Sequence, residues 1–197
     1  MGRSDAMTVS APSGVVTFLF TDVEGSTRRW ENDADEMRAA LAAHDEVLRD
    51  AIEAHRGFLF KHTGDGVCAA FSSPRAAVDA AIAAQRKLEL PVRMGIATGE
   101  AELREGDYFG AVLNRAARVM AAGHGGQILL ADSTAVLLSR VDLVDLGPRR
   151  LRDVPHSRRG VSGPSAGPAD GLSGAAGAGY DTGEPAACHN ELDRARV

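Results

Sequence analysis

The sequence GFLFKHTGDGVCAAF, from Gly57 to Phe71, contains two short apolar segments joined by a tight turn. Its spacing predicts a β-hairpin with strands at Phe58–Phe60 and Val67–Phe71 and a turn at residues 63–66. Glycines on both sides of Asp65 permit the backbone angles that hairpin turns often need. We therefore expect Asp65 to be held rigidly at the tip and to face outward. Taken alone, Asp65 is more simply interpreted as an ordinary turn former, because Asp is common in turns.

A second carboxylate, Asp22, ends another predicted strand. Residues Val15–Thr21 form a continuous β-branched and aromatic run, which is typical of a buried strand. The residues that follow include Gly25, and Ser26 or Thr27 is well placed to cap a helix. A strand, a glycine-bearing turn and a helix start together make a plausible phosphate site, because free backbone N–H groups point at the ligand.

Asp22 and Asp65 would lie side by side if their strands are neighbours. Two adjacent carboxylates repel each other unless a divalent cation lies between them. Mg²⁺ takes few protein carboxylates and completes its shell with substrate phosphates. Two such ions can activate an attacking oxygen and stabilise a leaving phosphate. The alternative is that both acids merely end strands, since surface acids are common in a chain with 27 Asp and Glu residues.

The rest of the chain alternates between helical and strand patterns. Helices are expected at 34–54, from Ser73-Pro74 onward, from about Gly110 and at 133–138, strands at 91–98, 127–130 and 141–146, and a loop at 102–107. The order is mainly β-α-β-β-α-β, which predicts an α+β fold with a ferredoxin-like core and additional strands and helices. His44 and His55 lie on or beside the buried stripe of the first helix. We interpret them as packing residues, because they lack paired metal-ligand spacing.

Composition excludes several classes of function. The net charge of −5 gives no general basic surface for nucleic acid. No apolar run reaches the length of about 18 residues that a membrane-spanning helix needs, and the N-terminus lacks the apolar core of a signal peptide. Cys68 lies in an apolar strand and is expected to be a small core residue. A cytoplasmic, reducing setting fits this cysteine usage.

Three regions differ in composition. Residues 1–14 are predicted to be disordered, and residues 15–155 to form one domain. Residues 156–197 are rich in Gly, Ala, Ser and Pro and poor in large apolar side chains. Such a low-complexity tail cannot bury enough surface to fold, so we expect it to be disordered.

Three motifs in order resemble the class III nucleotidyl cyclases, the adenylate and guanylate cyclase catalytic domain. They are FTDVEGST, KHTGDG and DYFGAVLNRAAR. The third supplies Asp107, then Asn114 seven residues on, then Arg118 four beyond. The flanking sequences GEAEL and HGGQILL are similar to actinobacterial members of the family. The resemblance covers about residues 15–155.

The resemblance implies that Asp22, Val23 and Asp65 bind two Mg²⁺ or Mn²⁺ ions. The loop of Gly25, Ser26 and Thr27 lies near the triphosphate.

The resemblance also implies roles for the remaining motif residues. Lys61 hydrogen-bonds the purine and Asp107 binds its other edge, a pair that selects adenine. Asn114 orients the ribose, and Arg118 meets the phosphate charge that develops in the transition state. A late basic residue, either Arg149 or Arg150, binds the terminal phosphates.

In this family the sites lie between two chains, with the metals from one subunit and the base and transition-state residues from the other. This chain holds both sets, so a homodimer with two equivalent sites is implied. The implied activity is that of an adenylate cyclase, which converts ATP to 3′,5′-cyclic AMP and pyrophosphate. The alternative is a non-catalytic cyclase-like module that binds nucleotide or only dimerises in a regulator, which the unusual C-terminus favours. Lys61 and Asp107 disfavour a guanylate cyclase.

Overall fold

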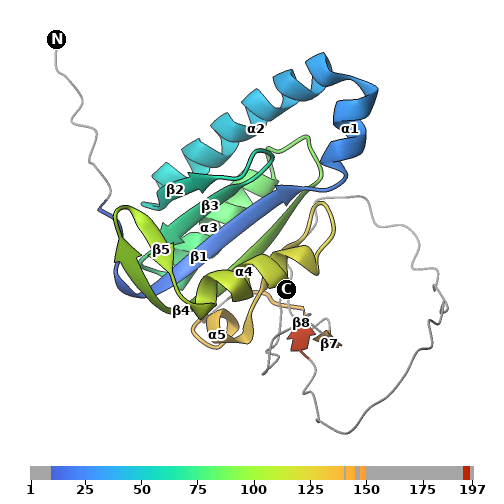
Figure 1. The fold of residues 1–197 in the computed structure, drawn as a ribbon. Coiled ribbons are helices and arrows are strands. Elements are labelled where there is room, and N and C mark those ends of the chain that lie inside the picture. The colour runs from blue at the N-terminus through green and yellow to red at the C-terminus, as the bar shows by residue number, and fades with distance from the viewer. Residues whose placement is uncertain (1–9, 140, 145–146, 150–192, 196–197) are drawn as a thin grey trace, which may run out of the picture.

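A computed structural model describes residues 10–139, 141–144, 147–149 and 193–195 (Figure 1). The helices are α1 (Ser26–Asn32), α2 (Ala34–Ala54), α3 (Pro74–Gln85), α4 (Ala111–Ala121) and α5 (Asp132–Ala135). The strands are β1 (Gly14–Val23), β2 (Phe58–His62), β3 (Val67–Phe71), β4 (Val92–Arg104), β5 (Asp107–Phe109), β6 (Ile128–Leu130), β7 (Gly147–Arg149) and β8 (Asp193–Ala195). In this described part of the chain, no helix is long and apolar enough to cross a membrane.

The main sheet has the strand order β2-β3-β1-β4-β5, with β6 pairing in parallel to β4. The pairs β2–β3, β3–β1 and β1–β4 are all antiparallel. Strands β1 to β4, with α2 and α3 as the connecting helices, therefore form the expected ferredoxin-like core, and the α+β class is confirmed.

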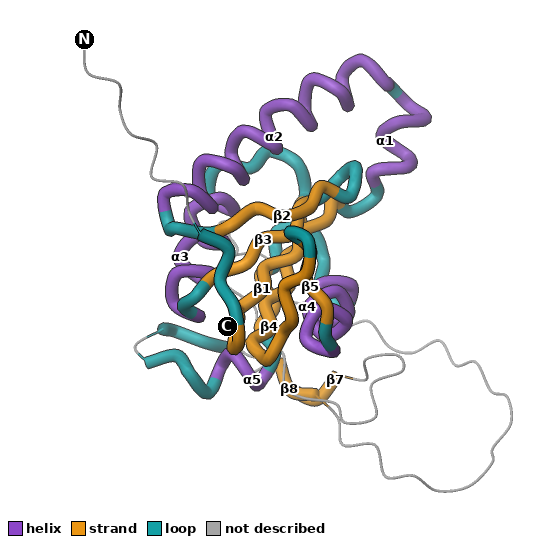
Figure 2. The backbone as a smooth tube through the Cα atoms, turned by 60° about the vertical axis from the view of Figure 1, so that its left-hand side comes forward, coloured by secondary structure: helices purple, strands orange, loops and turns teal. Residues whose placement is uncertain are grey.

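Helices cover both faces of this sheet, and each face has its own apolar core. Helices α2 and α3 pack on one face, where Leu19 of β1 contributes to the core. Helix α4 packs on the other face, to which Phe18 contributes. Figure 2 shows the sheet between α3 on one side and α4 on the other. Because neighbouring residues of a strand point to opposite faces, the unbroken apolar run of β1 serves both cores.

Two helix starts follow from their capping residues. Asp33 precedes α2, and its Oδ1 accepts hydrogen bonds from the backbone N–H groups of Asp35 and Glu36. Ser73 caps α3 in the same way, with Pro74 at the first helical position. The expected cap at Ser26 or Thr27 is wrong, because both lie inside α1. The preceding residue is Gly25, in the left-handed conformation at φ 70°, which has no side chain to form a cap.

Two sequence-based expectations about strands are also wrong. Residues 102–107 do not form a loop, since β4 continues to Arg104 and pairs with β5 in a hairpin. The outer half of β4 alternates between half-buried and exposed residues, which gave no apolar run to recognise. The strand expected at 141–146 is not formed by its described residues, 141–144. Instead, β7 pairs with β8, whose residues come from the region expected to be a disordered tail.

His44 is a core residue, as expected, at 2% exposed. His55 is half-buried, and its Nδ1 lies 2.8 Å from the backbone carbonyl of Ala51 in its own helix. Cys68 is a free, buried thiol. The expected disorder of residues 1–14 is wrong for its last residues, since Gly14 begins β1 and the carbonyl of Pro12 accepts a hydrogen bond from the Tyr108 hydroxyl. Residues 1–9, 156–192 and 196–197 lie outside the described part.

Candidate active site

The end of β1 and the β2–β3 turn bring Asp22 and Asp65 into neighbouring positions. The backbone N–H of Val23 donates to the carbonyl of Asp65 at 3.2 Å. Thr21 Oγ1 accepts from the backbone N–H of Val67 at 2.9 Å. A Cβ on Gly66 would lie 1.9 Å from the carbonyl oxygen of Thr21, so only glycine permits this close approach. The expectation that the two strands are neighbours is confirmed.

Arg93 was missed by sequence reasoning and contacts Asp22 directly. Its Nε and Nη2 atoms lie 2.8 Å and 2.6 Å from Asp22 Oδ2, and the two side chains are 28% and 23% exposed. Arg93 is the cross-strand partner of Asp22 on β4. Its role follows from the β1–β4 register, which cannot be deduced from the sequence alone. Arg93 balances one of the two carboxylate charges at this end of the sheet.

The donors at this end of the sheet fit a magnesium or manganese site. No group of three or more His, Cys, Asp or Glu side chains within the described residues could hold a metal ion. The expected set is smaller, because it consists of two carboxylates and Val23, which can offer only its backbone carbonyl. Mg²⁺ binds through one or two carboxylates and takes its other ligands from water and substrate phosphates. A small set of this kind is therefore sufficient for a metal that binds together with a nucleotide.

The loop after β1 is anchored by Glu24, which sequence reasoning also missed. Glu24 Oε2 accepts from the backbone N–H of Gly125 at 2.9 Å, and Oε1 lies 3.3 Å from His124 Nδ1. Its own N–H donates to the carbonyl of Pro91 at 2.9 Å. The hydrogen bond from Gly125, and then that from His124, lower the pKa of Glu24. These contacts fix the residue immediately before Gly25.

Lys61 and Asp107 come together although they lie far apart in sequence. Lys61 Nζ is 3.3 Å from Asp107 Oδ2, and the two side chains are 54% and 44% exposed. Asp107 Oδ1 accepts from the backbone N–H of Tyr108 at 2.8 Å. This hydrogen bond, and then the nearby ammonium group of Lys61, lower the pKa of Asp107. The structure therefore presents an ionised acceptor and a cationic donor, side by side and open to solvent.

Helix α4 carries Asn114 and Arg118, and it packs closely on β4. Asn114 is exposed and Arg118 is half-buried. A Cβ on Gly95 of β4 would lie 2.4 Å from the backbone nitrogen of Met120, so the helix and the strand are in near-contact. Of the late basic residues, Arg149 belongs to β7, with its side chain outside the description, and Arg150 lies outside the described residues.

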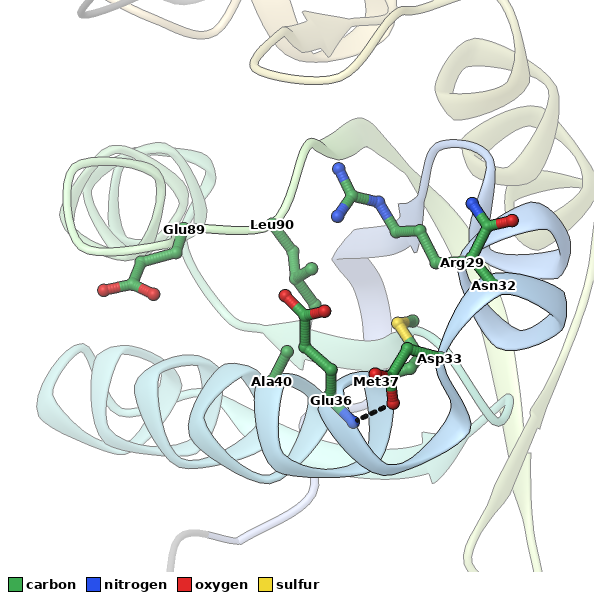
Figure 3. A pocket seen from close by; sticks show the side chains of 8 residues that line it. All are labelled: Arg29, Asn32, Asp33, Glu36, Met37, Ala40, Glu89 and Leu90. Atoms are coloured by element: carbon green, nitrogen blue, oxygen red, sulfur yellow. Dashed lines mark hydrogen bonds between the residues drawn. The ribbon is translucent and has the colours of Figure 1, made fainter.

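A cavity lies elsewhere in the molecule. It has a volume of about 330 Å³ and lies between α1, α2 and the loop before β4 (Figure 3). Three carboxylates, Asp33, Glu36 and Glu89, line it together with a single cation, Arg29. Asp33 is already engaged in capping α2. None of the predicted site residues lines this cavity, and its acidic lining is unsuited to a triphosphate.

Comparisons with known proteins agree with this geometry. No family model matches the chain. An uncharacterised protein of Mycobacterium tuberculosis is 38% identical over 154 residues, which cover 74% of this chain and 54% of that protein. An adenylate cyclase of Podospora anserina is 30% identical over 174 residues, which cover 71% of this chain and 8% of that protein. The chain thus spans about half the length of the mycobacterial relative.

The fold matches a solved structure over most of both chains. A structure of adenylate cyclases from Trypanosoma brucei in their monomeric state has a TM-score of 0.72 and 27% sequence identity. The match covers 77% of this chain and 90% of that chain. Sequence and structure therefore point to the same family of proteins.

Proposed function

Because this chain belongs to the class III adenylate and guanylate cyclase catalytic domains, we propose that it is an adenylate cyclase. It converts ATP to 3′,5′-cyclic AMP and pyrophosphate. The observation that carries the choice of adenine is the contact between Lys61 and Asp107. We call these two residues the purine-binding pair.

The purine-binding pair matches the edge of adenine. The carboxylate of Asp107 accepts a hydrogen bond from the exocyclic amino group, and the ammonium of Lys61 donates to a ring nitrogen. Guanine carries a carbonyl in place of this amino group. That carbonyl would face the Asp107 carboxylate, and two acceptors cannot form a hydrogen bond. A site built to hydrogen-bond one base rejects another when its polar groups are left unpaired.

Asp22, Asp65 and the Val23 carbonyl would hold two Mg²⁺ or Mn²⁺ ions at the end of β1. Such ions, when bound, lower the pKa of an attacking hydroxyl and offset charge on a leaving phosphate. The backbone around Gly25, Ser26 and Thr27 lies beside these acids, and Glu24 holds it in place. We infer that this loop binds the triphosphate, because free N–H groups at a helix start attract anions.

The reaction joins the ribose 3′-oxygen to the α-phosphorus and breaks the bond from that phosphorus to the bridging oxygen of pyrophosphate. The 3′-hydroxyl gives its proton to water, and pyrophosphate leaves. Asn114 orients the ribose, so that the hydroxyl meets the phosphorus in line. The guanidinium of Arg118 offsets the charge that develops on the phosphate, for which a planar, permanently charged group is suited. Two chains contribute to each site in a homodimer.

Purified protein incubated with Mn²⁺ and either ATP or GTP tests this proposal, with the cyclic nucleotide measured by chromatography. We expect cyclic AMP from ATP and a much lower yield of cyclic GMP. Asp22→Asn should abolish the product. Asp79→Asn is the matched control, because Asp79 forms a surface ion pair with Arg75 on α3. Nucleotide binding without any cyclic product, or a dimer that binds no nucleotide, would support the non-catalytic module instead.

A further inference from the structure

Lys61 and Asp107 belong to the two strands at opposite ends of the sheet order. Strands β3, β1 and β4 lie between β2 and β5. Neighbouring strands are about 4.8 Å apart, so a flat sheet would separate β2 from β5 by about 19 Å. Yet Lys61 Nζ and Asp107 Oδ2 are 3.3 Å apart. The β4–β5 hairpin must therefore fold over one face of the sheet.

Three aromatic rings hold the hairpin in this position. The ring of Tyr108 lies 5.0 Å from that of Phe18 and 4.9 Å from that of Phe60, with interplanar angles of 77° and 68°. Phe18 and Phe60 are themselves 5.9 Å apart at 80°. All three pairs have the edge-to-face geometry that aromatic rings prefer. We call Phe18, Phe60 and Tyr108 the aromatic clamp.

A β-bulge in β2 puts Phe60 and Lys61 on the same face. Leu59 pairs with Ala69, and Lys61 pairs with Cys68, so Phe60 is the extra residue. In a regular strand, consecutive side chains point to opposite faces, and Lys61 would face away from the clamp. Bulges commonly redirect a side chain beside an active site. Here the bulge lets one strand supply both a ring of the clamp and the lysine next to it.

The other side of the clamp is joined to Asp107 in a similar way. Tyr108 is 4% exposed, and its backbone N–H bonds Asp107 Oδ1. Its hydroxyl donates to the carbonyl of Pro12 at 2.7 Å, just before β1. Tyr108 is thus fixed at its ring, its backbone and its hydroxyl, and Asp107 is its immediate neighbour.

We propose that the aromatic clamp positions the purine-binding pair, so that Phe60 and Tyr108 determine base selectivity without touching the base. This inference rests on the proposed function for the identity of the ligand. The arrangement itself does not depend on that function. Loss of a clamp ring would release the β4–β5 hairpin and separate Asp107 from Lys61.

Nucleotide kinetics test the effect on base selectivity. Tyr108→Leu should raise the KM for ATP by about tenfold or more, because small misplacements of binding groups are costly. It should lower kcat less and reduce the preference for ATP over GTP. Tyr108→Phe keeps the ring and should retain the wild-type preference. Phe60→Leu is the second variant in case Tyr108→Leu does not fold, since Phe60 is only half-buried.

A control variant and a second measurement make the test independent of catalysis. Phe58→Leu removes a ring from β2 that packs on the same core face. Cys68 is 4% exposed, and burial raises its pKa to about 11. Cys68 is the cross-strand partner of Lys61, so it lies beside one member of the purine-binding pair. In a Cys188→Ser background Cys68 is the only thiol, and its rate of reaction with a disulfide reagent reports release of the hairpin.

The clamp predicts faster Cys68 labelling in Tyr108→Leu and Phe60→Leu than in the wild type, Tyr108→Phe and Phe58→Leu. Equal labelling rates in all folded variants would overturn it. Faster labelling with an unchanged preference for ATP would overturn its role in base selectivity. A wild-type chain that makes no cyclic nucleotide would contradict the proposed function. In that case, the labelling rates and the relative affinities for ATP and GTP still decide whether the clamp exists.

Discussion

Lys61 and Asp107 form an ion pair that contributes little to the stability of the fold. Both side chains are about half exposed, at 54% and 44%. Exposed ion pairs add little to the free energy of unfolding, because solvent screens their charges. The pair therefore gains little for the fold, while it presents a donor and an acceptor to solvent at a fixed spacing. This is the arrangement expected of residues that bind a ligand.

Exchanging both members of this pair should change which nucleotide is used. Lys61→Glu with Asp107→Cys replaces the donor by an acceptor and removes the carboxylate that accepts from the adenine amino group. The double variant should use ATP less well by about tenfold or more and gain activity with GTP, because adenine would leave polar groups unpaired. The measurement is kcat/KM for both nucleotides with Mn²⁺.

The ion pair of Glu102 and Arg104 provides a control for that exchange. It lies on the same hairpin and is similarly exposed, at 59% and 62%. Glu102→Gln should leave the preference for ATP unchanged. If the double variant keeps the wild-type preference as well, Lys61 and Asp107 do not select the base.

At the scale of elements, contacts between loops and strands decide where each functional residue lies. Glu24 joins the loop after β1 to the residues between α4 and β6 through the N–H of Gly125. Asp22 is joined to β4 through Arg93. Helix α4 is pressed against β4 at Gly95. Small changes at these contacts should therefore reach the site without altering any residue that binds substrate.

The contact of Glu24 predicts a pH dependence of stability. Its pKa is lowered, chiefly by the N–H of Gly125 and then by His124, from an ordinary value of 4.5. The stabilisation from the ionised carboxylate is thus fully present above pH 4.5 and is lost as the pH falls through the lower, folded-state pKa. Glu24→Gln should lower the free energy of unfolding by a constant amount near neutral pH, and this difference should shrink in acid.

Urea denaturation from neutral to acid pH measures this effect. Glu46→Gln is the control, because Glu46 is exposed on α2. A difference between wild type and Glu24→Gln that stays constant into strong acid would contradict a charge-dependent contact.

The packing of α4 on β4 predicts a large loss of stability in Gly95→Ala and a smaller loss in Gly99→Ala. In Gly95→Ala the new Cβ would lie 2.4 Å from the backbone nitrogen of Met120, so the helix must move. Overpacking of this kind costs about 1–3 kcal/mol of unfolding free energy. Because α4 carries Asn114 and Arg118, cyclase activity should fall as well. In Gly99→Ala the nearest atom is a side-chain carbon of Val112 at 3.2 Å, which can give way.

Thermal denaturation and a cyclase assay of both glycine variants check this prediction. Gly95→Ala should lose more stability and more activity than Gly99→Ala. Equal effects would mean that the close approach of α4 to β4 does not position the site.

The sequence predicts those elements whose signals are local. Helix α2 has a long apolar period and a capping Asp33, and its bounds, Ala34–Ala54, agree with the expectation. The β2–β3 hairpin has its glycine-rich turn. The β4–β5 hairpin could not be predicted in this way. Its residue Tyr108 packs on aromatic rings of β1 and β2, and no local sequence pattern indicates that contact.

The candidate site shows the same division. Asp22, Lys61 and Asp107 could be singled out because they stand in motifs or at strand ends. The importance of Arg93 depends on its position opposite Asp22 in the β1–β4 register. The importance of Tyr108 depends on the aromatic rings that it contacts in β1 and β2. Partners of this kind are fixed by strand order and by a bulge, which are properties of the folded sheet.

At the scale of the whole molecule, one chain carries every residue of the proposed site. Asp22 lies at the end of β1 and Asp65 in the neighbouring β2–β3 turn, the purine-binding pair joins β2 to β5, and Asn114 and Arg118 lie on α4. A two-fold dimer would use each set twice, in two equivalent sites.

Mixing two inactive variants tests whether the proposed sites are shared between chains. Asp22→Ala and Arg118→Ala homodimers should each be inactive, since every site lacks either a metal ligand or the transition-state arginine. In a heterodimer one site carries both lesions, and the other receives intact Asp22 from one chain and intact Arg118 from its partner. Random exchange makes half of the dimers mixed, each with one working site of two, so about a quarter of wild-type activity should return.

The measurement is cyclic AMP formed by the co-expressed pair. The controls are each variant alone and a mixture of the Asp79→Asn and Arg118→Ala variants. In the control mixture every chain keeps Asp22, so a site works whenever its Arg118 comes from an Asp79→Asn chain. The activity of this mixture should therefore exceed that of the test pair. If heterodimers are present and no activity returns, each site lies within a single chain and the shared-site proposal is wrong.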